Sequence, residues 1–178
     1  MEKVIYLVRH CEATGQSPDA ELTAEGREQA LALAEFFKDK QVNQIISSPY
    51  NRAIQSIMPT AEEKELDLFV HKNLRERALS KEHLVDWEEK LKESFKDFHK
   101  KLPGGESNSE ATERFLPILD DIKLGSNKTT ILVTHGNLMT LILHLFNSNY
   151  GFNDWKNLTN PDVYKIEIGK NNQLERIW

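Results

Sequence analysis

Apolar residues along the chain follow two patterns: short continuous runs, and longer stretches in which they recur every three or four positions. The continuous runs are rich in β-branched residues and predict buried strands. These runs lie at residues 4–8, 44–47, 67–70, 128–134, 163–169 and 173–178. The last two are close enough in sequence to form an edge hairpin around residues 170–173.

The periodic stretches predict amphipathic helices. Residues 22–40 carry one apolar face, and Thr23 can cap the start of this helix. In the segment 47–57, Ser48 is placed as a cap and Pro49 at the first helical position, where a missing N–H costs nothing. A further helix is expected to begin directly after His135 and to run through "HGNLMTLILHLF".

The region before "LPGGES" predicts one long amphipathic helix from residue 81 to residue 101. Its apolar stripe consists of Leu84, Trp87, Leu91, Phe95 and Phe98. The glycines after it end the helix, and Ser107 with Glu110 forms a capping box for the next one.

Strand and helix patterns alternate over the whole chain, without an internal repeat or a linker. This alternation predicts an α/β protein with a mostly parallel central sheet and helices on both faces, in three layers. A length of 178 residues suits one domain spanning 1–178.

Composition narrows the possible functions. The chain is 39% hydrophobic and 29% charged, with a formal net charge of -5, which disfavours a nucleic-acid or anionic-membrane partner. Its single cysteine excludes an internal disulfide and a cysteine-based zinc site. The run at residues 4–8 is too short for a leader peptide, and "LMTLILHLF" is too short to span a bilayer. We therefore expect a cytoplasmic protein, of which the sequence leaves the oligomeric state open.

Three predicted strands end in polar chemistry. Residues 4–8 lead into Arg9 and His10, residues 128–134 lead into His135, and residues 44–47 lead into a helix whose first turn carries Arg52. Ligands of open α/β sheets lie beyond the carboxyl ends of the strands. Arginine presents a fork of donors that suits phosphate oxygens, and helix N-termini add backbone N–H groups. The pattern predicts a site for a dianion beside a nucleophile.

Several segments together resemble the histidine phosphatase superfamily, also called the phosphoglycerate mutase-like family. They are "RHCE" (9–12), "LTAEGREQA" (22–30), "SSPYNRAIQS" (47–56), "LRE" (74–76), "GGES" (104–107) and "VTHGN" (133–137), in the family's order and spacing. The resemblance implies that His10 is a nucleophile phosphorylated during turnover. It also implies that Arg9, Arg52 and His135 clamp the phosphate, that Glu76 protonates the leaving group, and that neither metal nor cofactor is needed.

Other positions are less firmly assigned by the resemblance. Gly136 and Asn137 are expected to bind substrate at a helix N-terminus. Gln16 stands where the family carries a phosphate-contacting Asn, and we expect this exchange to lengthen or lose one phosphate contact. Cys11 stands where the family usually has Gly; because Cys tolerates positive φ poorly, the backbone there should not need it.

Three functions compete. The first choice is a phosphatase acting on a small phosphorylated metabolite, and the alternative enzyme is a phosphoglycerate mutase. "LRERALS" lacks the His-Tyr with which mutases of this family continue the acid motif. A non-catalytic phospho-ligand binder is the third, disfavoured because nucleophile and acid are both present. Residues 80–105 are expected to form a helical cap that sets substrate choice through polar residues such as Lys81 and Lys101.

Overall fold

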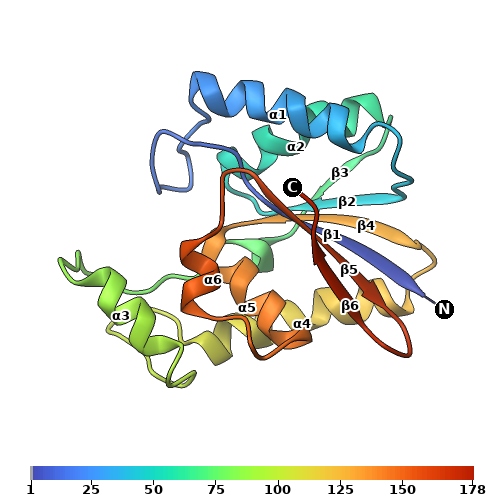
Figure 1. Ribbon diagram of the computed structural model, residues 1–178. Coiled ribbons are helices and arrows are strands. Elements are labelled where there is room, and N and C mark those ends of the chain that lie inside the picture. Colours follow the sequence, from blue (N-terminus) through green and yellow to red (C-terminus); the bar gives the residue numbers. More distant parts are fainter. Residues whose placement is uncertain (1) are drawn as a thin grey trace.

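The computed structural model describes residues 2–178, and its centre is a six-stranded sheet in the order β3-β2-β4-β1-β5-β6 (Figure 1). The strands are β1 (Lys3–Arg9), β2 (Gln44–Ser47), β3 (Leu68–Val70), β4 (Thr129–Thr134), β5 (Asp162–Ile168) and β6 (Gln173–Arg176). The first four run parallel, whereas β5 is antiparallel to β1 and β6 is antiparallel to β5. The mostly parallel sheet and the C-terminal hairpin are thus confirmed.

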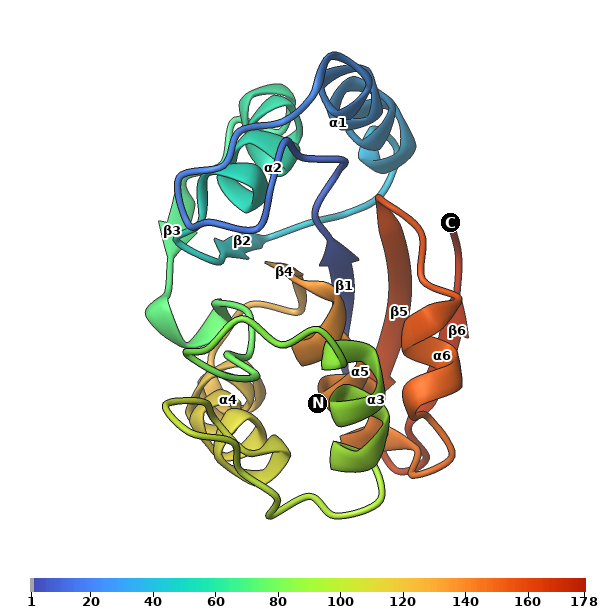
Figure 2. The same ribbon diagram turned by 90° about the vertical axis from the view of Figure 1, so that its left-hand side faces the viewer.

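Helices cover both faces of this sheet, which confirms the three predicted layers (Figure 2). They are α1 (Ala24–Phe37), α2 (Asn51–Glu63), α3 (Trp87–Ser94), α4 (Asn108–Leu124), α5 (Gly136–Phe146) and α6 (Phe152–Lys156), with a 3-10 turn, η1, at Lys72–Leu74. In β1, Tyr6 and Val8 pack into the cluster beneath α1 and α2. Ile5 and Leu7 belong to the opposite cluster beneath α4 and α5. The period-two alternation of the strand therefore divides the core into two halves.

The capping residues mark where sequence and structure agree on helix starts. Thr23 Oγ1 accepts a hydrogen bond from the backbone N–H of Gly26 at 2.9 Å, as predicted. Ser107 and Glu110 form the predicted capping box at the start of α4. The prediction for α2 is wrong by two residues, because this helix begins at Asn51 without a side-chain cap. Ser48 Oγ instead accepts from the backbone N–H of Tyr50 at 3.3 Å and shares a hydrogen bond with a histidine, described below.

The predicted long helix over residues 81–101 is also wrong, since only Trp87–Ser94 is α-helical. A helix of that length would hold its ends roughly 30 Å apart. Here the backbone N–H of Lys81 donates to the carbonyl oxygen of Pro103 at 3.2 Å, and that of Glu106 donates to Ala78 at 2.7 Å. Both ends of the segment are therefore tied together, and the chain must turn back on itself.

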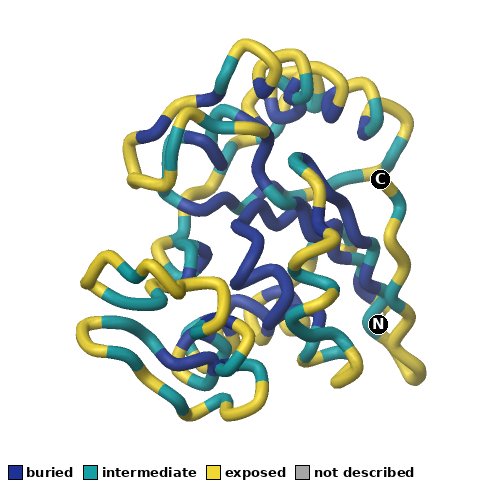
Figure 3. Tube along the Cα trace, turned by 60° about the vertical axis from the view of Figure 1, so that its left-hand side comes forward, coloured by how far each residue is buried: buried dark blue, intermediate teal, exposed yellow. Residues whose placement is uncertain are grey.

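Buried residues concentrate in the central strands and in α5 (Figure 3). The apolar run that begins α5 is buried from Gly136 to Leu143, which explains its composition without a membrane. Within residues 2–178, none of the helices combines the length and apolar character needed to cross a bilayer.

The sheet order also fixes where the polar strand ends meet. Strand β4 lies between β1 and β2, and all three run in the same direction. Their carboxyl ends therefore share one edge of the sheet, where the chain continues into His10, Ser48 and His135.

Candidate active site

His10 follows directly after β1 and is held in one tautomer by its own loop. Its Nδ1 donates to the backbone oxygen of Cys11 at 2.7 Å, an acceptor that requires a proton on Nδ1. The lone pair of Nε2 accepts a hydrogen bond from Arg52 Nε at 3.2 Å. Burial, aided by the charges of Arg52 and Arg9, lowers the pKa of His10 to about 3. The ring is therefore neutral, and Nε2 carries the free lone pair that a nucleophile needs.

His135 precedes α5 and lies beside His10, with ring centroids 5.1 Å apart. Its Nε2 shares a 2.7 Å hydrogen bond with Oγ of Ser48, the residue that directly follows β2. Burial and the neighbouring cations Arg52 and Arg9 lower the pKa of His135 well below its ordinary value. Its Nδ1 is buried and has no hydrogen-bond partner within the described part of the chain. An unpaired buried ring nitrogen of this kind is suited to a ligand oxygen.

Two arginines stand around the histidines, each fixed by main-chain oxygens. Arg9 Nη1 donates to the oxygens of Leu158 and Thr159 at 3.0 and 3.2 Å. Arg52 Nη1 donates to those of Gln16 and Ser17 at 3.1 and 2.7 Å. Burial lowers the pKa of both guanidinium groups, which nevertheless remain cationic at neutral pH.

Neither arginine is neutralised by a carboxylate at hydrogen-bond distance among residues 2–178. Arg9 Nε is in addition buried without a hydrogen-bond partner there. Buried cations without a carboxylate at hydrogen-bond distance are costly, and an anion bound between them would offset that cost. The arrangement therefore fits a phosphate dianion.

Glu76 reaches the same site from the loop after η1. Its Oε1 accepts from the backbone N–H groups of Leu138 and Arg77 at 2.9 and 2.8 Å, and its Oε2 accepts from that of Asn137 at 2.9 Å. Two of these donors belong to the first turn of α5, where the helix dipole favours a carboxylate. Glu76 is thus attached to the helix that also carries His135 at its start.

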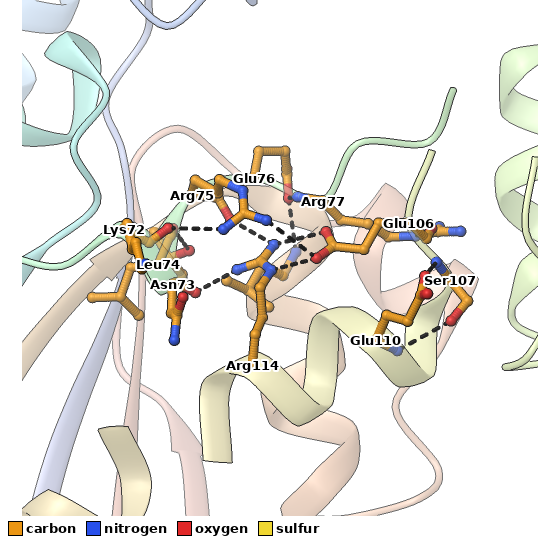
Figure 4. A network of polar contacts seen from close by, with 12 residues as sticks. Lys72, Asn73, Leu74, Arg75, Glu76, Arg77, Glu106, Ser107, Glu110 and Arg114 are labelled. Carbon is orange, nitrogen blue, oxygen red and sulfur yellow. Dashed lines mark hydrogen bonds and ion pairs between the residues drawn. The ribbon is translucent and has the colours of Figure 1, made fainter. Parts of the chain in front are cut away.

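An arginine of α4 donates hydrogen bonds to the main chain of the loop that carries Glu76 (Figure 4). Arg114 Nη1 donates to the backbone oxygen of Asn73, and its Nη2 donates to that of Arg75 at 3.0 Å. The same guanidinium makes a two-pronged contact with Glu106, with Nε–Oε1 at 2.6 Å and Nη2–Oε2 at 3.0 Å. Arg77 Nε in turn donates to the backbone oxygen of Glu106 at 2.9 Å. The "GGES" segment and the loop that carries Glu76 (the acid loop) are therefore joined by hydrogen bonds into one unit.

These residues surround a cavity of about 480 Å³. It is lined by Arg9, His10, Gln16, Glu76, Arg77, Leu79, Trp87, Leu91, Gly136, Asn137 and Trp155. All eight residues expected at the site are brought together. Six line the cavity, Arg52 donates a hydrogen bond to His10, and the ring of His135 lies beside that of His10. A Cβ at Gly136 would lie 3.2 Å from Arg9 Nε, so a larger residue there would require the Arg9 side chain to shift slightly.

Segment 80–105 contributes to this cavity differently from the sequence prediction. Trp87 and Leu91 of the predicted apolar stripe line the cavity. Lys81 and Lys101 do not, and Lys101 instead pairs with Glu110 on α4 at 2.7 Å. A polar role in substrate choice for these two lysines has no support in the geometry.

Three residues of the site were missed from the sequence. Ser48 was interpreted as a helix cap, and its local sequence gives no sign of the hydrogen bond that it shares with His135. Asn160 donates from Nδ2 to the backbone oxygen of His10 at 2.7 Å, although 150 positions separate them. Trp155 lies in the short helix α6, which was not predicted at all. Nothing in the local sequence around Asn160 or Trp155 points to the site.

Cys11 behaves as its buried position requires. Within residues 2–178 Glu65 is the one non-glycine residue with a positive φ, so Cys11 does not occupy that conformation, as expected. Burial raises the pKa of its thiol to about 11, so the group stays protonated at neutral pH. A nucleophilic role for this thiol is therefore disfavoured.

No group of three or more His, Cys, Asp or Glu side chains in residues 2–178 is arranged to hold a metal ion. Arg9 and Arg52 beside His10 are instead cationic, which suits direct contact with phosphate oxygens.

Comparison with known proteins shows which family and which solved structures this chain resembles. The sequence profile of the histidine phosphatase superfamily (branch 1) matches residues 5–178. A putative phosphoserine phosphatase 2 of Hydrogenobacter thermophilus is 28% identical, over 93% of this chain and 90% of that protein. A probable phosphoglycerate mutase of an Enterobacter species is 33% identical, over 74% of this chain and 69% of that protein. Among solved structures, mycobacterial glucosyl-3-phosphoglycerate phosphatase superposes with a TM-score of 0.78 at 21% identity, covering 100% of this chain and 99% of that one.

Proposed function

Because the chain belongs to the histidine phosphatase superfamily, we propose that it hydrolyses a small phosphomonoester through a phosphohistidine intermediate on His10. In the first step Nε2 of His10 attacks phosphorus, and the bond from phosphorus to the ester oxygen breaks. In the second step water attacks the phosphohistidine and releases inorganic phosphate. Covalent catalysis of this kind divides one difficult transfer into two easier ones.

The observation that carries this proposal is the orientation of His10. The carbonyl of Cys11 fixes the proton on Nδ1, and the lone pair of Nε2 faces the guanidinium of Arg52. Burial beside two cations lowers the pKa of His10 to about 3 and keeps the ring neutral, so Nε2 is available to attack phosphorus. An incoming phosphate would take over the Arg52 N–H and present its phosphorus to Nε2.

The surrounding groups then stabilise the transferred phosphoryl group. Arg9, Arg52 and Nδ1 of His135 are assigned to its non-bridging oxygens, where fixed positive charge lowers the barrier. Glu76 is assigned the transfer of a proton to the departing alkoxide, after which its carboxylate takes a proton from the attacking water. The residues present need no metal for these steps.

The test is detection of the phosphohistidine. Rapid mixing with a ³²P-labelled phosphomonoester and an early quench should leave acid-labile, base-stable label on the protein. The label should be absent from His10→Ala. It should be retained in His83→Ala, a matched substitution of an exposed histidine that does not line the cavity. Equal labelling of His10→Ala and the parent protein would refute the assignment.

A mutase is the second candidate, because one relative at 33% identity is named a probable phosphoglycerate mutase. A mutase returns the phosphoryl group of the phosphohistidine to the substrate, whereas a phosphatase passes it to water. Incubation with 3-phosphoglycerate separates the two: release of inorganic phosphate supports the hydrolase, and net formation of 2-phosphoglycerate supports the mutase.

A further inference from the structure

The cavity beside His10 contains two chemically different groups of lining residues. Arg9, His10, Glu76 and Asn137 supply charge and hydrogen bonds, and they come from the end of β1, the loop after η1 and the start of α5. The remainder of the lining includes an apolar set from other elements, namely Leu79, Trp87, Leu91 and Trp155. Figure 1 shows that α3 and α6, which carry three of these four, lie at the edge of the sheet where β1 ends.

The two tryptophans form one aromatic wall, defined here as Trp87 and Trp155. Their rings meet edge to face, with centroids 5.8 Å apart. Phe152 stacks behind Trp155 at 5.5 Å, and the ion pair of Lys156 with Glu88 at 2.8 Å joins α6 to α3 next to the wall. The indoles come from helices 68 positions apart and are nevertheless held together, so the wall is a built feature of the cavity.

The cavity has few charged side chains that could bind a charged leaving group. Apart from Arg9, His10 and Glu76, the one ionisable side chain lining the cavity in residues 2–178 is Arg77. Its Nε and Nη1 already donate to the backbone oxygen of Glu106 and to Ser94 Oγ, at 2.9 and 3.0 Å. A leaving group with a carboxylate and an ammonium would therefore lose hydration against indole and leucine side chains without a full set of partners.

We infer that the leaving group of the substrate is an apolar, ring-bearing alcohol, whose flat face packs against the aromatic wall while its phosphate reaches His10. This inference rests on the proposed function and adds the chemical class of its substrate. Aromatic pairing and burial of a phenyl-sized group favour such an ester over a short one. The wall thus contributes specificity in a region where the sequence pattern suggested polar residues.

The experiment compares three esters of primary alcohols, 2-phenylethyl phosphate, ethyl phosphate and O-phosphoserine, which share a similar reacting bond. For the parent protein, kcat/KM for 2-phenylethyl phosphate should exceed that for each of the other two by about tenfold or more. Trp87→Ala and Trp155→Ala should each reduce this preference severalfold, and Trp155→Phe should restore part of it. Trp178→Ala is the matched control, because Trp178 packs on Phe36 and does not line the cavity.

Each outcome decides the matter. A preference for O-phosphoserine, or a preference for 2-phenylethyl phosphate that survives in Trp87→Ala, would overturn the inference while leaving a phosphatase in place. Trp87 is 46% exposed, so its alanine variant should fold even where Trp155→Ala does not. Failure of the parent protein to turn over any of the three esters, together with absence of phosphohistidine, would overturn the proposed function itself.

Discussion

Replacing Arg114 by Met should weaken both the fold and the placement of Glu76. The guanidinium of Arg114 pairs with Glu106 and donates to the backbone oxygens of Asn73 and Arg75, just before Glu76 in the chain. The two paired side chains are 11% and 15% exposed, so water replaces these partners poorly. Met keeps much of the side-chain volume and removes only the charge and the donors.

The magnitude follows from burial. Removing one partner of a buried ion pair typically costs about 3–5 kcal/mol, because the other charge is left uncompensated. In this protein Arg75 Nη2 lies 3.5 Å from Glu106 and can compensate in part. We therefore expect a loss near the lower end, about 3 kcal/mol. A typical stability of about 5–15 kcal/mol leaves such a variant folded at room temperature.

Urea denaturation measures the first effect. The control is Lys38→Met, which breaks the pair with Glu35 at 3.4 Å, where the side chains are 53% and 73% exposed. That change should cost less than about 1 kcal/mol. An Arg114→Met loss no larger than the control would refute the view that this pair holds the acid loop.

Kinetics measures the second effect, since Arg114 is a positioning residue that acts through Glu76. Arg114→Met should slow hydrolysis of an alkyl phosphate by about tenfold to hundredfold at saturating substrate. Nitrophenyl phosphate, whose leaving group departs without a proton, should be slowed less. Equal losses for both esters would place Arg114 outside the function of Glu76 and leave it a purely structural residue.

Three further predictions concern the site itself. Glu76→Gln should slow alkyl phosphates by about 10²–10⁴-fold but nitrophenyl phosphate little, whereas His135→Ala should slow both alike; a uniform loss in Glu76→Gln would exclude it as proton donor. Cys11→Ala should retain most activity, and iodoacetamide should not label the native thiol at neutral pH, because burial raises its pKa to about 11. The pKa of His10 is about 3, below its unfolded value, so the unfolded state gains the proton first as pH falls and stability declines from about pH 6.5 toward 3. Between about pH 7 and about pH 4, the free energy of unfolding of His10→Asn should therefore fall by about 3 kcal/mol less than that of the parent protein, as measured by urea denaturation. The same decline in both proteins would contradict that pKa.

The sheet and the meeting of its polar strand ends could be predicted because both depend on local patterns. A β-branched run such as residues 4–8 is interpretable by itself, and parallel neighbours must place Arg9 and His135 at one edge. The prediction of a helix over residues 81–101 failed for the opposite reason. Its periodicity is real, but the contacts that tie Lys81 to Pro103 and Ala78 to Glu106 are tertiary and leave no periodic signal.

The same distinction separates the site residues that were found from those that were missed. Those found lie at strand ends, as His10 does, or in local segments that resemble the family, as Glu76 does in "LRE". Ser48, Trp155 and Asn160 act through partners 87, 68 and 150 positions away. For such residues the fold must be known before a side chain of ordinary type can be given a function.

Cys11 shows why a departure from a family motif need not disturb the chemistry. What the site takes from this position is main chain: its carbonyl oxygen accepts from His10 Nδ1, and its N–H donates to Ser56 Oγ at 2.8 Å. Its side chain points into the apolar cluster with Val8 and Ala53. Since the backbone there does not adopt a positive φ, the requirement is for a small side chain and not for glycine. The tautomer of His10, the proposed nucleophile, is thus set by peptide atoms, which a substitution of the Cys11 side chain leaves unchanged.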